Sequence, residues 1–202
     1  MAIVTIARHF GAGGRTLGEM IAAKLGFEFY DNELIQRVST QAKVSVSTVD
    51  EMEKYTGGVF KRFVSDIVPK GLKDLMVTRK QDIIDEEIYV DILKRIINEI
   101  ADGGNAVIIG RGSQYILKDR EDVYHLLITG EKDDRIRFLK EKYHVTHDQA
   151  VRAVTQDERR RANLYQKFGE TDYDQPHRYH LVVNTSKLDF ETAADLAVAL
   201  IQ

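Results

Sequence analysis

The sequence has no cysteine among its 202 residues. Disulfide bonds, thiolate metal sites and cysteine nucleophiles are therefore excluded. A surplus of positive charge is also absent, because 29 lysines and arginines stand against 32 aspartates and glutamates, for a formal net charge of -3. General nucleic-acid binders are normally basic, so we expect no nucleic-acid partner.

Long hydrophobic runs are missing as well. No apolar stretch approaches the roughly 18 residues needed to span a bilayer. The opening MAIVTIARHF lacks the basic region and cleavage site of a signal peptide. We therefore expect a cytoplasmic protein with no membrane partner. With 43% hydrophobic and 30% charged residues, the composition is that of an ordinary globular domain.

Short apolar runs alternate with helical patterns along the chain. Strands are predicted at residues 3–7, 106–110, 123–129 and 180–184, with a short strand end or connector at 27–31. Helices are predicted at 17–25, 32–41, 84–100, 131–143 and 190–201, and from Thr146 through the arginine-rich stretch. The strand runs lack polar alternation, which is typical of a sheet covered on both faces. The pattern predicts an α/β fold with a doubly wound parallel sheet of about five strands.

Three segments carry further predictions. Isoleucines recur every four residues from Ile84 to Ile100, which indicates one apolar helix face, either core or a dimer face. Thr146 and Gln149 have the spacing of a capping box. Residues 47–82 are predicted to form short helices around a break.

The segment FGAGGRT follows the first predicted strand and opens a helix. In a parallel sheet, ligands bind at the carboxyl ends of strands. Glycines in such a turn let backbone N–H groups converge on a phosphate, with a helix amino terminus behind them. The candidate ATP- or phosphate-binding residues are Gly11, Ala12, Gly13, Gly14, Arg15 and Thr16. The alternative is a glycine turn without a ligand.

The lysine of the full pattern G-x-x-x-x-G-K-[ST] is absent. In one register, Arg15 replaces the lysine and Thr16 follows it. In the other register, Gly14 takes the place of the lysine, and Arg15 takes the place of the Ser or Thr whose hydroxyl binds magnesium. This register aligns the following helix without a gap. Positive charge would then come from Arg8 or Arg15, because a guanidinium grips phosphate oxygens through two bonds. No metal ligand is assigned, and Thr16 is the candidate left open.

Three further motifs follow this loop along the chain. The segment YDNELIQR (30–37) resembles an acceptor-binding stretch. The segment VIIGRGSQYILKD (107–119) resembles a Gly-Arg-Asp motif after the third strand, and DERRRANL (157–164) resembles an arginine-bearing lid. Together with the loop, they resemble the cytidylate-kinase-like family of nucleoside monophosphate kinases. The resemblance implies P-loop kinase topology in a single domain over residues 1–202. It also implies a helical acceptor-binding or dimer region at about 32–82 and a lid-like region at about 152–178. Within the former, residues 43–82 are left open as an acceptor-binding subdomain or a dimer arm.

The resemblance implies phosphoryl transfer from ATP, with Mg²⁺, to a nucleoside monophosphate such as (d)CMP or a related acceptor. The expected partner is a nucleotide or a phosphorylated small molecule, and a homodimer is left open. Arg15, Arg111 and Arg161 would be the catalytic residues. Gly112 departs from the family, because cytidylate kinases carry there an aspartate that contacts the base.

Acceptor binding is implied for Asp31, Arg37 and Arg111. Arg111 sits between two glycines after a buried-type strand, a costly place for a merely solvated charge, and a structural ion pair is the alternative. Asp31 would orient Arg37 or cap the following helix. An exposed helical arginine is equally compatible with the position of Arg37.

The lid is implied at Glu158, Arg159, Arg160 and Arg161. Three consecutive arginines cannot share one helix face, so one or two of them are expected to point at a phosphate. His144 and His147 are three residues apart, but no third metal ligand accompanies them, which favours a surface position.

The missing lysine keeps a second hypothesis open: a nucleotide-binding sensor or partner protein with a degenerate loop and no turnover. A third hypothesis is a structural α/β protein without a nucleotide site.

Overall fold

The computed structural model describes residues 1–31, 33–43, 45, 86–170 and 173–202. It contains one sheet of five strands: β1 (Ile3–Arg8), β2 (Glu28–Tyr30), β3 (Ala106–Ile109), β4 (Val123–Thr129) and β5 (Leu181–Asn184). All neighbouring strands are parallel, in the order β2-β3-β1-β4-β5. The predicted parallel sheet is therefore confirmed.

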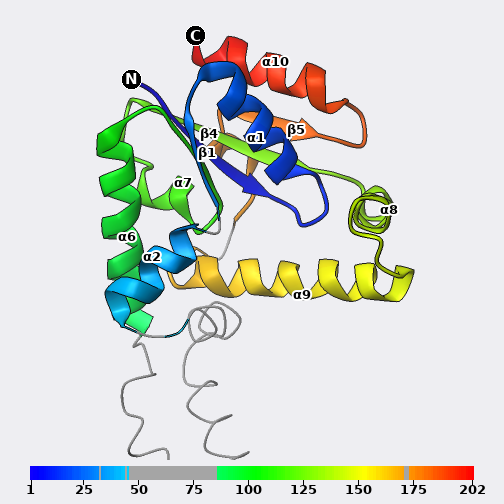
Figure 1. Cartoon of the computed structure of the whole chain (residues 1–202), viewed down its shortest axis with the longest axis horizontal. Coiled ribbons are helices and arrows are strands. Elements are labelled where there is room, and N and C mark those ends of the chain that lie inside the picture. The colour runs from blue at the N-terminus through cyan, green and yellow to red at the C-terminus, as the bar shows by residue number, and fades with distance from the viewer. Residues whose placement is uncertain (32, 44, 46–85, 171–172) are drawn as a thin grey trace, which may run out of the picture.

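Helices cover both faces of this sheet (Figure 1). They are α1 (Gly14–Leu25), α2 (Glu33–Ala42), α6 (Glu86–Gly103), α7 (Ser113–Ile116), α8 (Lys132–Tyr143), α9 (His147–Gln166) and α10 (Phe190–Ile201), with a 3₁₀ turn at Pro176–Arg178. α1 packs beside α10, and α2 packs beside α6 on the other side of the sheet. α8 and α9 pack against each other, and α8 lies beyond the end of β1.

Alternation along the strands explains the two layers of core. Val4 and Ile6 of β1 are fully buried in the cluster that includes Leu17 and Ile21 of α1. Ile3 points the other way, into the cluster with the apolar face of α6. Because both faces of the strand are covered by helices, every position can be apolar, and the sequence shows no polar alternation there.

Most helix limits agree with the local signals. Thr146 and Gln149 form the predicted capping box at the start of α9. Gly26, in the left-handed conformation, ends α1. Ile92, Ile96 and Ile100 of the isoleucine stripe are buried on one face of α6, whereas Ile88 is exposed and Ile84 lies outside the described residues. α7 was not predicted, and the predictions for 47–82 lie outside the described residues.

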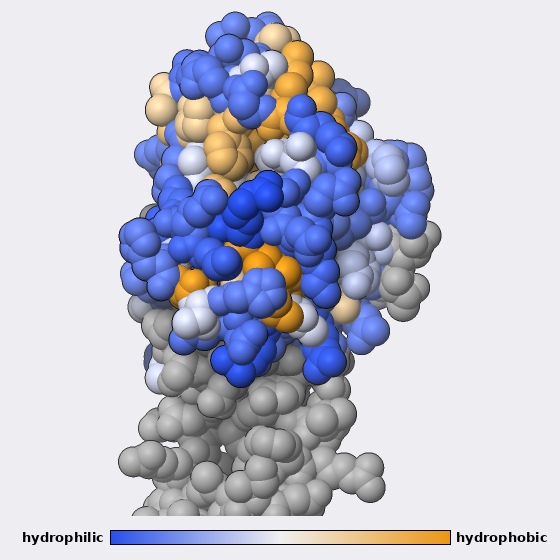
Figure 2. Space-filling model, turned by 90° about the vertical axis from the view of Figure 1, so that its right-hand side faces the viewer, coloured by the Kyte–Doolittle hydropathy of each residue, from blue (hydrophilic) through white to orange (hydrophobic). Residues whose placement is uncertain are grey.

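Within the described ranges, no helix is both long and apolar enough to cross a membrane. Seen from the side that carries α8, the surface is mostly hydrophilic, with apolar residues in separate patches (Figure 2).

Candidate functional site

A cavity of about 550 Å³ lies where the loops after β1, β2 and β3 meet α8 and α9. It is lined by Arg8, His9, Phe10, Gly11, Gly13, Gly14, Arg15, Thr16, Asp31, Gln36, Arg111, Phe138, Leu139, Tyr143 and Arg160. Ligands of parallel α/β sheets bind at this edge, outside the carboxyl ends of the strands. The fold therefore gathers the glycine loop and most of the predicted phosphate-binding residues around one space.

Close packing explains the glycines of the loop. Gly11 has φ 83°, and a Cβ there would lie 2.7 Å from the carbonyl oxygen of Arg135. Gly13 has φ 72° and caps α1, and a Cβ there would overlap the ring of Phe190. The loop is thus pressed between α8 and α10, and the first turn of α1 forms the cavity wall. The free N–H groups of a first helical turn favour an anion.

Ala12 is the one member of the predicted cradle that does not line the cavity. Its N–H donates a hydrogen bond to the carbonyl of His9 at 3.1 Å, and its side chain is buried in the core. Ala12 therefore supports the shape of the loop from behind.

The turn after β3 has a conformation that favours glycine at every position. Gly110, Arg111 and Gly112 have φ values of 69°, 56° and 71°. For an arginine this left-handed conformation is strained, and such strain persists where the surroundings impose it, often at functional sites. The turn holds the buried Arg111 against the cavity.

Positive charge dominates the cavity wall. Four of the lining residues are arginines, whereas Asp31 is the one carboxylate among them. The Asp31 carboxylate lies 3.7 Å from Nη2 of Arg8 and 3.6 Å from Nη1 of Arg15. Burial lowers the pKa of Arg8, and although Asp31 counteracts this effect, the charge of Arg111 adds to it. An arginine stays charged under these conditions, so the cavity attracts anions although the chain is net negative.

The three predicted acceptor-binding residues do not all reach the cavity. Asp31 and Arg111 line the cavity, but Arg37 does not. The Arg37 guanidinium lies 5.4 Å from the centre of the Tyr30 ring, in a cation–π contact. The neighbouring Gln36 lines the cavity instead.

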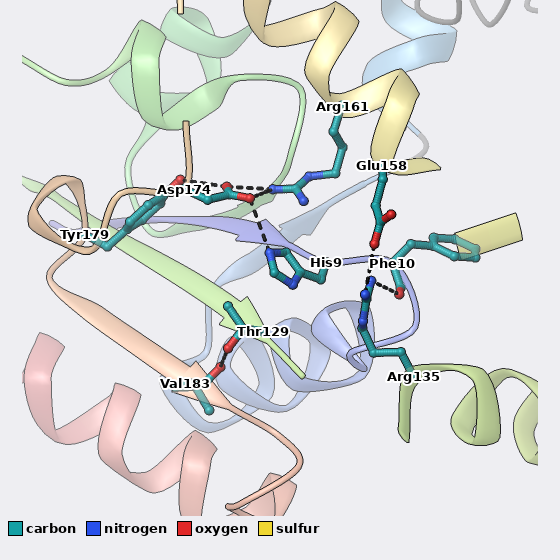
Figure 3. Close-up of polar contacts among 9 residues, drawn as sticks. All are labelled: His9, Phe10, Thr129, Arg135, Glu158, Arg161, Asp174, Tyr179 and Val183. Carbon is teal, nitrogen blue, oxygen red and sulfur yellow. Dashed lines mark hydrogen bonds and ion pairs between the residues drawn. The ribbon is translucent and has the colours of Figure 1, made fainter. Parts of the chain in front are cut away.

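Arg161 belongs to a partly buried polar network rather than to the cavity wall. Its Nη2 donates to both carboxylate oxygens of Asp174, at 2.7 and 2.8 Å (Figure 3). His9 Nε2 lies 3.3 Å from the same carboxylate, so the network connects α9 to the glycine loop. Burial opposes the ionisation of Asp174, but the hydrogen bond from His9 and the charge of Arg161 lower its pKa.

The other predicted lid residues have three different environments. Glu158 accepts a hydrogen bond at 2.9 Å from Arg135 of α8, whose Nη1 also approaches the carbonyl of Phe10 at 3.4 Å (Figure 3). Arg159 is exposed. Arg160 lines the cavity. One of the three consecutive arginines therefore faces the cavity, while Arg161 faces Asp174.

A lysine reaches the loop from another element. Lys142, in the last turn of α8, donates a hydrogen bond from Nζ to the Thr16 hydroxyl at 2.7 Å. The Thr16 hydroxyl and the Asp31 carboxylate, whose oxygens could act as metal ligands, thus already contact cations. Among the described residues, no cluster of three or more His, Asp or Glu side chains could hold a metal. These side chains do not form a site for Mg²⁺, which in phosphate sites is held largely by phosphates and water.

Motif reasoning missed several residues of the cavity wall. Phe10 and Gln36 lie within FGAGGRT and YDNELIQR but received no role there, and Phe138, Leu139 and Tyr143 belong to no recognised motif. The last three come from α8, which is far from the loop in sequence. The close approach of α8 to Gly11 is a tertiary feature, so no local pattern indicates it.

Comparisons with known proteins agree with this architecture. A structure of an uncharacterized protein from Eubacterium ventriosum matches with a TM-score of 0.69 and 19% identity, over 100% of this chain and 98% of that one. Shikimate kinase from Bacteroides thetaiotaomicron matches with a TM-score of 0.51 and 17% identity, over 99% and 98%. A sugar kinase from Janibacter matches with a TM-score of 0.50 and 13% identity, over 100% and 94%. At these identities the matches establish a kinase-like fold.

No curated protein sequence matches this chain significantly. The model of the cytidylate kinase-like family, by contrast, matches residues 3–187. This range includes the glycine loop, the turn at Arg111 and the whole of α9. The chain therefore belongs to the cytidylate kinase-like family.

Proposed function

We propose that this protein transfers the γ-phosphoryl group of ATP to the phosphate of a nucleoside monophosphate or a related phosphorylated acceptor. The observation that carries the proposal is the cavity at the glycine loop, where four arginines from three separate parts of the chain come together. Two polyanionic substrates can meet only where several cations offset their charge. Phosphoryl transfer depends mostly on such positioning and electrostatic stabilisation.

In the proposed mechanism, the loop amides at Gly11, Gly13 and Gly14 hold the donor phosphates, with Arg15 and Thr16 at the rim. Arg111 and Asp31 position the acceptor. An oxygen of the acceptor phosphate attacks the γ-phosphorus, the bond from that phosphorus to the β–γ bridging oxygen breaks, and ADP leaves with the electron pair. Mg²⁺ would arrive with the nucleotide, and no step above depends on a protein ligand for it.

Arginines from α9 complete the proposed site. Arg160 lines the cavity, so it is the α9 residue proposed to reach the transferring charge. Arg161 would act through its bond to Asp174, by fixing the position of α9 relative to His9. In this role Arg161 is a positioning residue.

Gly112 bears on which acceptor is used. A Cβ at this position would lie 2.5 Å from the ring of Phe168, and the residue has φ 71°. An aspartate cannot occupy such a position without moving Phe168. Position 112 therefore offers no carboxylate to bind cytosine, and acceptors other than (d)CMP are also compatible with the site.

A coupled assay of ADP formation tests the proposal. Purified protein is given ATP with each nucleoside monophosphate in turn, and the unfolding temperature is measured with and without each nucleotide. We expect ADP formation above the ATP-only background with at least one acceptor. Stabilisation by nucleotides without any ADP formation would favour the sensor that the missing lysine suggests. No stabilisation by any nucleotide would contradict nucleotide binding altogether.

A further inference from the structure

We infer that Arg8 supplies the positive charge that the lysine supplies in ordinary phosphate-binding loops, and that Gly14 is glycine in order to leave room for it. The inference rests on the proposed function and identifies the residue that completes its donor site. At positions 8 and 14, the glycine and the cationic residue of the ordinary pattern have changed places. In the gap-free register, residue 8 takes the slot of the first glycine and residue 14 takes the slot of the lysine.

Space at the start of α1 is what couples these two positions. A Cβ at Gly14 would lie 2.8 Å from Cβ, 3.0 Å from Cδ and 3.2 Å from Cγ of Arg8. The Arg8 stem thus occupies the volume through which a lysine at position 14 would leave the backbone. Gly14 does not have a positive φ, so the backbone conformation does not explain the glycine there. The neighbouring side chain does.

The direction of the Arg8 side chain follows from the strand. Side chains alternate along β1, and Val4 and Ile6 face α1. Arg8 continues this series on the same face, toward the first turn of that helix. Its position at the end of the strand brings it to the cavity, where its side chain is 24% exposed.

The guanidinium lies between the donor and acceptor parts of the proposed site. A Cβ at Gly110 would overlap Nη1 of Arg8, so the turn that carries Arg111 also makes room for this side chain. On the other side, Nη2 of Arg8 lies 3.7 Å from the Asp31 carboxylate. Arg8 therefore extends from the glycine loop, past Gly14, to the turn that carries Arg111. In the proposed function, the phosphoryl group would be transferred along this path.

Arg15, the other candidate, is placed less favourably. Its side chain is 51% exposed, and its Nε donates to Glu19 of the same helix at 2.9 Å. A solvated charge of this kind is weak compared with one held in a partly buried site. Arg15 suits a rim contact with the nucleotide.

The test compares six variants by ATP affinity in calorimetry, by kcat with the best acceptor and by unfolding temperature without nucleotide. Arg8→Met should lower kcat by about 10²- to 10³-fold, as expected when one stabilising donor of a transition state is lost. Arg8→Lys keeps the charge but not the two-pronged geometry and should stay within about tenfold of the parent protein. Arg137→Met, an exposed arginine of α8, is the control and should change nothing. Arg15→Met should lose less activity than Arg8→Met.

The exchange variants make the test sharper. Gly14→Lys alone should lose both ATP affinity and stability, because its stem meets Arg8. The double variant Arg8→Gly/Gly14→Lys removes that clash and restores the ordinary pattern, so it should recover at least about tenfold in kcat over Arg8→Met.

Two results would overturn the inference: Arg8→Met matching the parent protein in kcat and ATP affinity, or Arg15→Met losing more than Arg8→Met. If the parent protein forms no ADP with any acceptor, the proposed function fails and ATP affinity alone decides the role of Arg8. About tenfold weaker ATP binding by Arg8→Met would then support the role, and unchanged binding would refute it.

Discussion

The backbone of Arg111 adopts a conformation that few residues other than glycine adopt, at φ 56° between two glycines. Removing the side chain in two ways separates its chemistry from its strain. Arg111→Gly and Arg111→Ala lose the same guanidinium, but only alanine keeps a Cβ in the left-handed region, at a cost of about 1 kcal/mol. We expect the glycine variant to be more stable by that amount in urea unfolding.

Both Arg111 variants should raise KM for the acceptor by about tenfold or more, because a charge-assisted contact to phosphate is lost. Equal stability of the two variants would contradict the strain at this position. An unchanged KM in both would contradict its role in acceptor binding.

Individual residues were predictable where one local rule decides them. Arg111 stood out in the sequence because an arginine between two glycines after a buried strand is costly, and the structure places it, buried, at the cavity. Arg8 was recognised only as a possible source of charge, since its significance depends on contact with Gly14 and Gly110 in the folded chain. Gln36 and Arg37 illustrate the limit: neighbouring helical positions point about 100° apart, and the sequence does not show which of them faces the cavity.

Two helices from the second half of the chain, α8 and α9, are joined by the pair of Arg135 and Glu158. The Arg135 side chain is 7% exposed, so loss of its partner leaves a buried charge that is poorly compensated. Glu158 itself is half exposed, which reduces the effect. Glu158→Ala should lower the free energy of unfolding by about 1 kcal/mol. Glu141→Ala, an exposed position on α8, serves as the control, and an equal loss in both would show that the pair contributes nothing.

Strands β1 and β4 share a buried histidine with a pH-dependent consequence. His125 Nδ1 lies 2.6 Å from the Thr5 hydroxyl, and burial together with the nearby His180 lowers the pKa of His125 to about 4. The unfolded chain has an ordinary histidine pKa near 6.5, so it binds this proton first as pH falls. Stability is therefore lost between about pH 6.5 and 4, by up to roughly 3 kcal/mol.

His125→Gln removes the titrating group and keeps a side chain that can bond to Thr5. Its free energy of unfolding should fall less steeply over this pH range than that of the parent protein. His177→Gln, at an exposed site, should keep the full slope. Parallel pH profiles for the parent protein and His125→Gln would contradict a lowered pKa at this position.

Regular elements were more predictable than their arrangement. The residue range of β4 and that of α10 follow directly from apolar runs and helical spacing. α7 spans four residues, too few to show a helical period, and was missed. The contact of α8 with the glycine loop joins segments more than a hundred residues apart, so periodicity cannot reveal it.

At the scale of the whole molecule, the order β2-β3-β1-β4-β5 places the glycine loop beside the turn after β3. After β1 the chain forms β2 and β3 on one side of that strand, and it then crosses to form β4 and β5 on the other side. The cavity lies at the edge of the sheet where this change of direction occurs. Exposed Leu196, Leu200 and Val182 lie on α10 and β5, away from the cavity. Association into a homodimer remains a prediction, open to test by sedimentation.

The central claim is that donor and acceptor phosphates meet in one cavity. Calorimetric titration with adenosine linked through five phosphates to each common nucleoside tests it most directly, with ATP alone as the reference. One molecule that fills both halves of the site gains the advantage of linked binding, which is worth about 10²-fold or more. We predict that at least one of these compounds binds at least that much more tightly than ATP. If all of them bind no more tightly than ATP, the cavity does not hold two nucleotides and the account is contradicted.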